Sequence, residues 1–269
     1  MNHLPQRKIN GGNDEYFTKP SVAEKCVNSL FAKLDPALES IFIEPSAGNG
    51  VFSKIIMGHD KKIISYDIEP QHKSIIKKDF LNINFNKNNI KDAIFIGNPP
   101  FGTCSNLAIK FFNKSSEAAS HIGFILPKTF RKHSIQMKIN HYFHLIHDED
   151  LPKNSFLVNG VEHDVPTVFQ IWEKQKNKRE PLRIPNDYIT WTKKSDADFA
   201  IRRVGGNAGT IYTDNFLNFS DSSNYFCVEK CGGVIEKLKQ ADFRSIVNNT
   251  AGVRSLSKLE ILNFLHSQC

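Results

Sequence analysis

The sequence predicts an α/β fold built on a Rossmann-like, doubly wound and mostly parallel sheet, with a final antiparallel hairpin and a small C-terminal extension. Two apolar runs carry this prediction. The run 41–44 breaks into a glycine-containing turn and then a helical stretch, 51–56, which is the strand–turn–helix order of such folds. The run 93–96 ends abruptly at Gly-Asn-Pro-Pro, as a buried strand does at the rim of a sheet. Because open α/β sheets hold ligands at this rim, the residues after both runs are candidates for a binding site.

The turn after the first run is suited to a cationic ligand. Its sequence, Glu-Pro-Ser-Ala-Gly-Asn-Gly, does not match the Gly-x-Gly-x-x-Gly phosphate fingerprint, and the Glu44 carboxylate would not favour a pyrophosphate. S-adenosylmethionine carries a sulfonium and an ammonium, and the turn looks like the cofactor loop of class I methyltransferases. That resemblance implies cofactor contacts from Glu44, Pro45, Ala47, Gly48 and Gly50.

Two segments further along the chain supply partners for a nucleoside. The run 62–66 ends in Asp67, whose carboxylate could accept from both ribose hydroxyls, and Ile68 could pack against an adenine face. Asp79 and Phe80 resemble the family's Asp-Phe/Leu segment. The resemblance places both residues at the cofactor, with the Asp79 carboxylate accepting from the adenine amine.

The loop after the run 93–96 is suited to an amine. Two consecutive prolines stiffen it and provide no N–H donors, so it presents acceptors. The Asn98 side-chain oxygen and the Pro99 carbonyl could both accept from one exocyclic NH₂ group, and the Phe101 ring could stack on a base. The stretch resembles the Asn-Pro-Pro-Phe/Tyr motif of amino-methylating enzymes. This implies a catalytic loop of Asn98, Pro99, Pro100 and Phe101, with Asn98 also at the cofactor.

The N-terminal segment extends the resemblance. Residues 14–20 precede a helix with its apolar residues on one face, and Pro20 suits the first helical turn. Phe17-Thr18-Lys19-Pro20 matches the Phe-Thr-x-Pro segment that wraps the methionine end of the cofactor in DNA amino-methyltransferases, which implies cofactor contacts from Phe17 and Thr18. The order of motifs resembles the gamma-like DNA adenine-N6 methyltransferases, and the match covers residues 14–175.

The resemblance implies transfer of a methyl group from S-adenosylmethionine to N6 of a flipped adenine in DNA, in a restriction-modification, phage or mobile-element setting. An RNA adenine-N6 methyltransferase is the first alternative, because similar loops act on RNA and even on a protein glutamine amide. A non-catalytic nucleic-acid or cofactor-binding protein is the alternative from a different class. The intact Asn-Pro-Pro chemistry argues against it.

Charge favours a nucleic-acid partner, with DNA as the first choice and RNA as the second. The formal net charge is +7, and basic clusters occur at 128–138 and 174–179. The apolar run 121–126 predicts a strand whose end brings the first cluster to the same rim as Asn98. The predicted phosphate contacts are Lys128, Arg131 and Lys132.

A hairpin with limbs in 142–146 and 166–172 is expected to finish the sheet. Residues 148–156 between the limbs are predicted to form a loop that could close over a flipped base. Phe156 in this loop is a second candidate for base stacking, and a place in the hairpin core is the alternative.

Composition sets the remaining limits. The 269 residues, 40% hydrophobic and 23% charged, can bury one large core with a small addition. No apolar stretch approaches the roughly 20 residues of a membrane span, and no signal peptide is apparent, so a soluble cytoplasmic protein without a membrane partner is expected. Five irregularly spaced cysteines indicate neither a disulfide framework nor a metal site. The predicted domains are a flexible lead (1–13), a methyltransferase domain (14–178) and an extension (179–269) that is a candidate target-recognition module or a packing extension.

Overall fold

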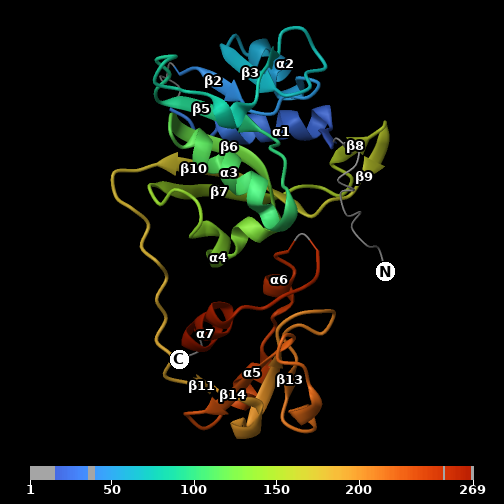
Figure 1. The fold of residues 1–269 in the computed structure, drawn as a ribbon, viewed down its shortest axis with the longest axis vertical. Helices are drawn as coiled ribbons and strands as arrows, with labels where there is room; N and C mark the ends of the chain where they lie inside the picture. Colours follow the sequence, from blue (N-terminus) through green and yellow to red (C-terminus); the bar gives the residue numbers. More distant parts are fainter. Residues whose placement is uncertain (1–15, 36–39, 251, 268–269) are drawn as a thin grey trace. The chain divides into compact units, whose positions relative to one another are not determined.

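The computed structural model describes residues 16–35, 40–250 and 252–267, so the predicted lead 1–13 lies outside the described residues. The chain divides into two compact units, an N-terminal unit of residues 1–180 and a C-terminal unit of residues 181–269. Figure 1 draws both units. No helix among the described residues is long and apolar enough to cross a membrane.

The N-terminal unit is built on a seven-stranded sheet with the order β4-β3-β2-β5-β6-β10-β7. Strands β4 to β6 are parallel, whereas β10 runs antiparallel to both of its neighbours, β6 and β7. The predicted Rossmann-like sheet with a final antiparallel hairpin is therefore confirmed. The strands are β2 (Phe42–Glu44), β3 (Ile63–Asp67), β4 (Ile76–Lys77), β5 (Ala93–Gly97), β6 (Ala119–Pro127), β7 (Phe143–Asp150) and β10 (Thr167–Lys174).

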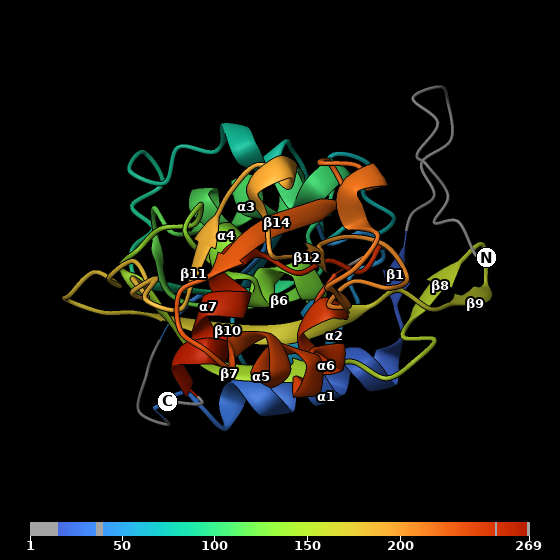
Figure 2. The ribbon, with the colours of Figure 1, turned by 90° about the horizontal axis from the view of Figure 1, so that it is seen from below.

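Helices cover both faces of this sheet. On one face lie α1 (Pro20–Phe31) and α2 (Val51–Gly58), which share a buried cluster with Ile94 and Ile96 of β5. On the other face lies α3 (Asn106–Ser115), whose cluster includes Phe95. Figure 2 shows α1 and α3 on opposite sides of the strands. Because both faces of β5 are covered, the strand is a continuous apolar run rather than an alternating one.

The segment between β7 and β10 differs from the predicted loop. Strand β7 continues through Asp150, and a hairpin of β8 (Phe156–Val158) and β9 (Val161–His163) follows. An Asn-Gly turn with positive φ joins these two strands, as expected for a tight hairpin. Strand β8 pairs in turn with β1 (Phe17–Thr18) to form a small three-stranded sheet. The hairpin therefore fixes the N-terminal segment on the main domain.

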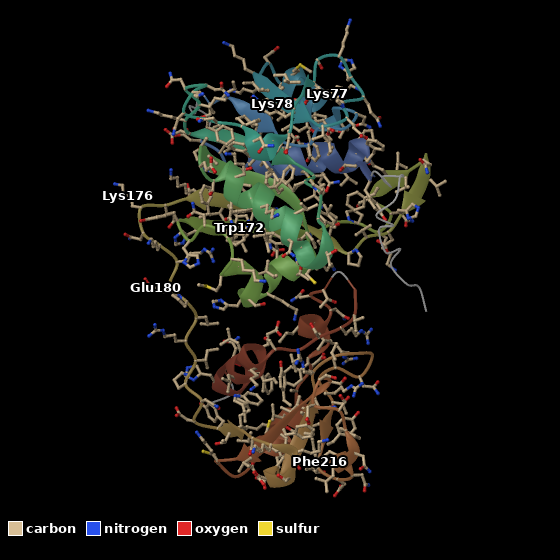
Figure 3. All side chains as sticks on the ribbon, viewed as in Figure 1. Lys77, Lys78, Trp172, Lys176, Glu180 and Phe216 are labelled. Atoms are coloured by element: carbon tan, nitrogen blue, oxygen red, sulfur yellow. The ribbon has the colours of Figure 1, made fainter. Side chains whose placement is uncertain are left out.

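Short helical turns complete the N-terminal unit. They are η1 (Phe80–Asn82), η2 (Thr103–Ser105), η3 (Lys128–Arg131) and α4 (His133–Gln136). The core beside α3 includes Trp172, labelled in Figure 3, which is fully buried with its ring centroid 5.6 Å from that of Phe112.

The C-terminal unit has its own four-stranded antiparallel sheet, in the order β11-β14-β12-β13. Helices lie against one face of the sheet, and a smaller apolar cluster around Phe226 lies on the other. The elements are β11 (Ile189–Trp191), η4 (Lys194–Asp196), β12 (Phe199–Arg202), β13 (Ile211–Tyr212), η5 (Phe216–Asn218), β14 (Asn224–Glu229), α5 (Val234–Gln240), α6 (Arg244–Val247) and α7 (Lys258–Ser267).

Candidate functional site

Three loops that follow β2, β3 and β5 meet at the carboxyl ends of these parallel strands. The Gly48 backbone N–H donates to Asp67 Oδ2 at 2.7 Å, which fastens the turn after β2 to the end of β3. The Ser46 hydroxyl donates to the Asn98 carbonyl at 3.2 Å, which fastens the same turn to the loop after β5. Residues from three distant sequence segments therefore form one site at the rim where an open sheet binds its ligands.

Asp67 is oriented by backbone donors. Besides Gly48, the Glu69 N–H donates to its Oδ1 at 2.8 Å. Each carboxylate oxygen has more than one lone pair, so both can still accept from ligand hydroxyls. Ile68, the next residue, leaves 57% of its surface exposed beside this carboxylate. The arrangement provides two acceptors and an apolar contact at the end of β3.

Glu44 is a buried carboxyl at the end of β2, with 1% of its surface exposed. Its Oε2 accepts from the Ser53 N–H at 3.1 Å and from the Ser53 hydroxyl, which also contacts the Ser65 hydroxyl. Burial raises the pKa of Glu44 to about 8, and the negative charge of Asp67 acts in the same direction, while the bonds from Ser53 oppose them. At neutral pH the carboxyl therefore mostly keeps its proton. A cationic ligand nearby would favour its ionised form.

Glycine is needed in the turn after β2 because the backbone is left-handed there. Gly48 has φ +51° and Gly50 has φ +74°. A Cβ built on Gly48 would lie 3.0 Å from Phe17 Cε1, so the Phe17 ring covers this turn closely. The remaining members of the predicted cofactor loop, Pro45 and Ala47, are buried.

The N-terminal segment reaches the same site. Pairing of β1 with β8 sets Phe17 opposite Leu157 and Thr18 opposite Phe156. The Asn98 Nδ2 donates to the Tyr16 carbonyl at 3.2 Å. The sequence motifs indicated Phe17, Thr18 and Asn98 separately, but the Tyr16 carbonyl and the serines around Glu44 were missed because they belong to no motif.

Two buried acceptors in this site lack a hydrogen-bond partner among the described residues. They are Asn98 Oδ1 and Thr18 Oγ1. An unsatisfied buried polar atom costs about 1–3 kcal/mol, and native proteins contain few of them. Because the amide nitrogen of Asn98 is engaged by Tyr16, its oxygen is the group left to accept from a ligand.

The loop after Asn98 is held by left-handed residues and backbone bonds. Gly102, Cys104 and Ser105 have φ of +68°, +52° and +63°. The Phe101 carbonyl accepts from two N–H groups at the start of α3, at 3.1 and 3.2 Å. Phe101 is partly exposed and packs against both core clusters, while Pro99 is buried and Pro100 is partly exposed.

Asp79 and Phe80 separate in the structure. The Asp79 carboxylate is exposed and accepts from the Leu81 N–H at 2.9 Å and from Asn82 Nδ2 at 2.7 Å, so it caps η1. The Phe80 ring is 2% exposed and stacks on Phe111 in the core, with centroids 5.5 Å apart. Asp79 therefore keeps surface access near the end of β3, whereas Phe80 contributes to packing.

The predicted phosphate contacts Lys128 and Arg131 pair with acidic residues of β7. Arg131 contacts Asp148 and Asp150, and Lys128 lies 2.7 Å from Asp150. A phosphate at these cations would compete with carboxylates of the protein itself. Lys132 is the third predicted contact and is partly exposed.

Phe156, the second candidate for base stacking, lies in the apolar cluster beneath α1. It is 1% exposed and meets the Tyr16 ring edge to face, with centroids 6.3 Å apart. This position is the hairpin-core alternative of the sequence analysis. At this degree of burial the Phe156 ring offers no face on which a base could stack.

Among the described residues, no group of three His, Cys, Asp or Glu side chains could hold a metal ion. The four described cysteines are free: Cys26, Cys104, Cys227 and Cys231.

Comparison with known proteins found no family model that matches the chain. Ribosomal RNA small subunit methyltransferase A of Mycoplasmopsis synoviae (strain 53) is 24% identical over 124 residues, which are 42% of this chain and 46% of that protein. The chain thus matches about half the length of this curated relative. A "putative RNA methyltransferase" from Pyrococcus horikoshii has a TM-score of 0.47 at 16% identity, over 60% of this chain and 88% of that one. A "putative class I S-adenosylmethionine-dependent methyltransferase" from Listeria monocytogenes has a TM-score of 0.46 at 13% identity, over 65% and 66%.

Proposed function

We propose that this chain is an S-adenosylmethionine-dependent methyltransferase that acts on the exocyclic amine (N6) of adenine in nucleic acid. The observation that carries the proposal is the buried Oδ1 of Asn98 at the carboxyl end of β5, which has no hydrogen-bond partner in the described parts of the chain. The amide is fixed through its nitrogen, so its oxygen is positioned for an N–H donor. An exocyclic amine provides that donor, and a second hydrogen for the Pro99 carbonyl.

The residues around the turn after β2 fit the proposed cofactor. Asp67 offers acceptors for ribose hydroxyls, and Glu44 offers a carboxyl that a cation would ionise. The buried Thr18 hydroxyl has no hydrogen-bond partner within the described segments and could bond to the ligand. Because Gly48 has no side chain, the turn can lie close to the Phe17 ring, where a larger residue would not fit. When bound, S-adenosylmethionine supplies a methyl group that its positive sulfur makes electrophilic.

The residues of the loop after β5 would then act on the target amine. Adenine N6 is a poor nucleophile because its lone pair is delocalised into the ring. Acceptance of its two hydrogens by Asn98 Oδ1 and the Pro99 carbonyl would favour a pyramidal nitrogen and hold it in line with the methyl group. The nitrogen would form its bond to the methyl carbon as the carbon–sulfur bond breaks and the electron pair stays on sulfur. One N6 proton would then pass to water, so no covalent enzyme intermediate is needed. Phe101 would stack on the extruded base, which offsets part of the energy of unstacking.

Two observations bear on whether the adenine belongs to RNA or to DNA, and they favour different answers. The curated relative is named for ribosomal RNA, which favours RNA as the substrate. The Phe17-Thr18-Lys19-Pro20 segment is more typical of DNA enzymes. RNA is the first candidate, because the relative is an aligned protein whereas the segment is only four residues long, and DNA is the second.

A methyl-transfer assay with labelled cofactor tests the proposal on total RNA, single-stranded DNA and duplex DNA. Nucleosides from the digested product should contain N6-methyladenosine or its deoxy form. Methylation confined to a ring carbon or a ribose would reject the amine assignment. Failure of the purified chain to bind S-adenosylmethionine by calorimetry would reject the methyltransferase itself.

A further inference from the structure

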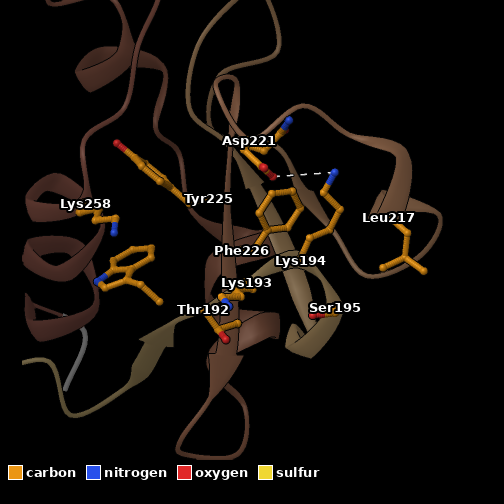
Figure 4. Close-up of a pocket in the computed structure, with 11 residues that line it drawn as sticks. Thr192, Lys193, Lys194, Ser195, Leu217, Asp221, Tyr225, Phe226 and Lys258 are labelled. Carbon is orange, nitrogen blue, oxygen red and sulfur yellow. Dashed lines mark ion pairs between the residues drawn. The ribbon is translucent and has the colours of Figure 1, made fainter.

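The C-terminal unit contains a pocket that no sequence motif indicated. It is an open hollow of about 780 Å³ whose lining comes from the end of β11 with the following turn, from residues 217–226, and from the start of α7. Figure 4 shows lysine and aromatic side chains around it. We propose that this pocket binds single-stranded nucleic acid, with bases against its aromatic rings and phosphates at its lysines.

Two aromatic rings form one side of the pocket. Trp191 ends β11 and Tyr225 lies near the start of β14, and their ring centroids are 5.4 Å apart at an interplanar angle of 61°. Both side chains are partly exposed rather than sealed in the core. Partly exposed rings beside cations are the usual platform for unpaired bases, since every base has a face that can stack.

Cations surround these rings. The Lys258 ammonium lies 4.7 Å from the Trp191 ring centroid and 5.6 Å from that of Tyr225. The Arg203 guanidinium lies 5.2 Å from the Tyr225 ring centroid. Lys193, labelled in Figure 4, is exposed in the lining. A phosphodiester bound here would meet positive charge within reach of the stacking surface.

The lining contains one acidic side chain, which neutralises little of this charge. Asp221 pairs with Lys194 at 3.7 Å, and its side chain is 80% exposed. Lys194 also donates to the Phe219 carbonyl at 2.6 Å, which fixes its ammonium beside Phe226. Lys193 and Lys258 remain unmatched by any acid of the pocket, so the lining favours an anion.

The side-chain oxygen of Asn224 gives the pocket an acceptor that can select a ligand with a hydrogen-bond donor. Asn224 is 3% exposed and lines the pocket, and its Nδ2 donates to the Ser220 carbonyl at 2.8 Å. Its Oδ1 is buried without a hydrogen-bond partner among the described residues. A base amine or a ribose hydroxyl could supply the missing donor. Stacking surface, positive charge and an unpartnered acceptor together match a nucleotide better than an acidic peptide, which would leave the rings without a planar partner.

This inference rests on the proposed function only for the role of the pocket, which would hold the substrate strand of a nucleic-acid methyltransferase. As a binding site it depends on residues of the C-terminal unit alone. The test therefore measures binding, and it uses the full chain.

Tryptophan fluorescence gives a direct signal, because the chain has two tryptophans and Trp172 is fully buried. Titration with a 12-nucleotide single-stranded oligonucleotide, as RNA and as DNA, should quench the Trp191 emission. Trp191→Phe should remove the quenching. Affinities of the variants are measured by the anisotropy of a fluorescein-labelled oligonucleotide, because Trp191→Ala lacks the reporting tryptophan. Trp191→Ala and Lys258→Ala should each weaken binding about tenfold, in line with stacking worth about 1–3 kcal/mol per base. Lys239→Ala, which removes an exposed lysine of α5 outside the pocket, should bind as the unaltered chain does.

Trp191→Ala, Lys258→Ala and the unaltered chain should show the same circular dichroism, and Lys258→Ala alone suffices if the tryptophan variant does not fold. Oligonucleotide binding that none of the pocket variants weakens overturns the inference. Quenching by polyglutamate but not by either oligonucleotide also overturns it, in favour of an acidic protein partner. If the unaltered chain binds RNA more tightly than DNA and Asn224→Ala removes this difference, a ribose hydroxyl is the donor to Asn224 Oδ1. If the purified chain does not bind S-adenosylmethionine but the oligonucleotide still quenches Trp191, the proposed methyltransferase is rejected and the proposed binding pocket is retained.

Discussion

Each unit of this chain contains an asparagine whose side-chain oxygen is buried and in the same state. The side-chain nitrogens of Asn98 and Asn224 each donate to a backbone carbonyl, and neither Oδ1 has a hydrogen-bond partner among the described residues. Asn98 follows a parallel strand, where a loop at the sheet rim brings motif residues together. Asn224 begins an antiparallel strand, and its neighbours in the pocket come from three separate segments. The first site is therefore predictable from local sequence and the second is not.

The largest expected effect concerns the first asparagine. Asn98→Ala should lower the rate of methyl transfer by about 10²–10³-fold, because it removes an acceptor that acts on the reacting amine. Cofactor affinity, measured by calorimetry, should stay within about twofold. Asn224→Ala should instead weaken oligonucleotide binding and leave the rate at saturating substrate unchanged.

Asn28→Ala is the matched control for this pair, since it makes the same truncation on the exposed side of α1. It should alter neither rate nor affinity. If Asn98→Ala retained full turnover while Asn224→Ala lost it, the roles of the two sites would have to be exchanged.

Asp67→Ala should have the next largest effect. It removes the acceptor for ribose hydroxyls and releases the Gly48 N–H, so S-adenosylmethionine should bind about 1–3 kcal/mol more weakly by calorimetry. Glu69→Ala, two residues further along, removes an exposed carboxylate and serves as the control. Equal affinity in a folded Asp67→Ala variant would locate the cofactor elsewhere.

Glu44 permits a prediction of pH dependence. Because its pKa is raised to about 8 by burial, it mostly keeps its proton at pH 7, and a bound cation should ionise it. Cofactor binding at pH 7 should therefore release a proton, and affinity should rise as the pH approaches 8. Calorimetry in two buffers of different ionisation enthalpy measures this release, which Glu44→Gln should abolish.

The same residue links stability to pH. The folded-state pKa lies above the unfolded value of 4.5, so the contribution of Glu44 to stability is fully present below about pH 4.5 and is lost as the pH rises to about 8. In Glu44→Gln the unfolding free energy should decline less over that interval. An identical decline in the two proteins would mean that Glu44 is ionised throughout.

These differences show which parts of the molecule a sequence can reveal. The parallel sheet and its final hairpin were predictable because apolar runs and abrupt loop signals mark buried strands. The extension of β7 through Asp148-Glu149-Asp150 was not, because Asp148 and Asp150 pair with Arg131 and Lys128 of η3. Glu149 pairs with Lys25 of α1. Charge pairing across a fold leaves no periodic pattern.

The candidate site divides in the same way. Motifs indicated the turn after β2, Asp67 and Asn98, whose places are set by the strands before them. Phe80 was predicted to lie at the cofactor because it follows Asp79 in the Asp-Phe/Leu segment, but its ring lies in the core. The contact of Tyr16 with Asn98 depends on pairing between β1 and β8, which only the folded chain brings about. For the same reason nothing in the sequence joined Trp191, Tyr225 and Lys258.

The smallest expected effect tests whether an unpartnered acceptor marks a ligand in the first site. Thr18 Oγ1 is buried and has no hydrogen-bond partner among the residues that the structure describes, so Thr18→Val keeps the shape of the side chain and removes an unsatisfied polar atom. The unfolding free energy of the free protein should stay the same or rise by up to about 1 kcal/mol, measured by urea denaturation. Cofactor affinity should fall severalfold, because the lost hydroxyl can no longer bond to the ligand. A variant that keeps or gains stability but loses cofactor affinity identifies a ligand contact rather than a packing residue. If Thr18→Val lost stability and kept its affinity, this hydroxyl would be part of the fold, and Asn98 and Asn224 would need separate evidence that their oxygens await a ligand.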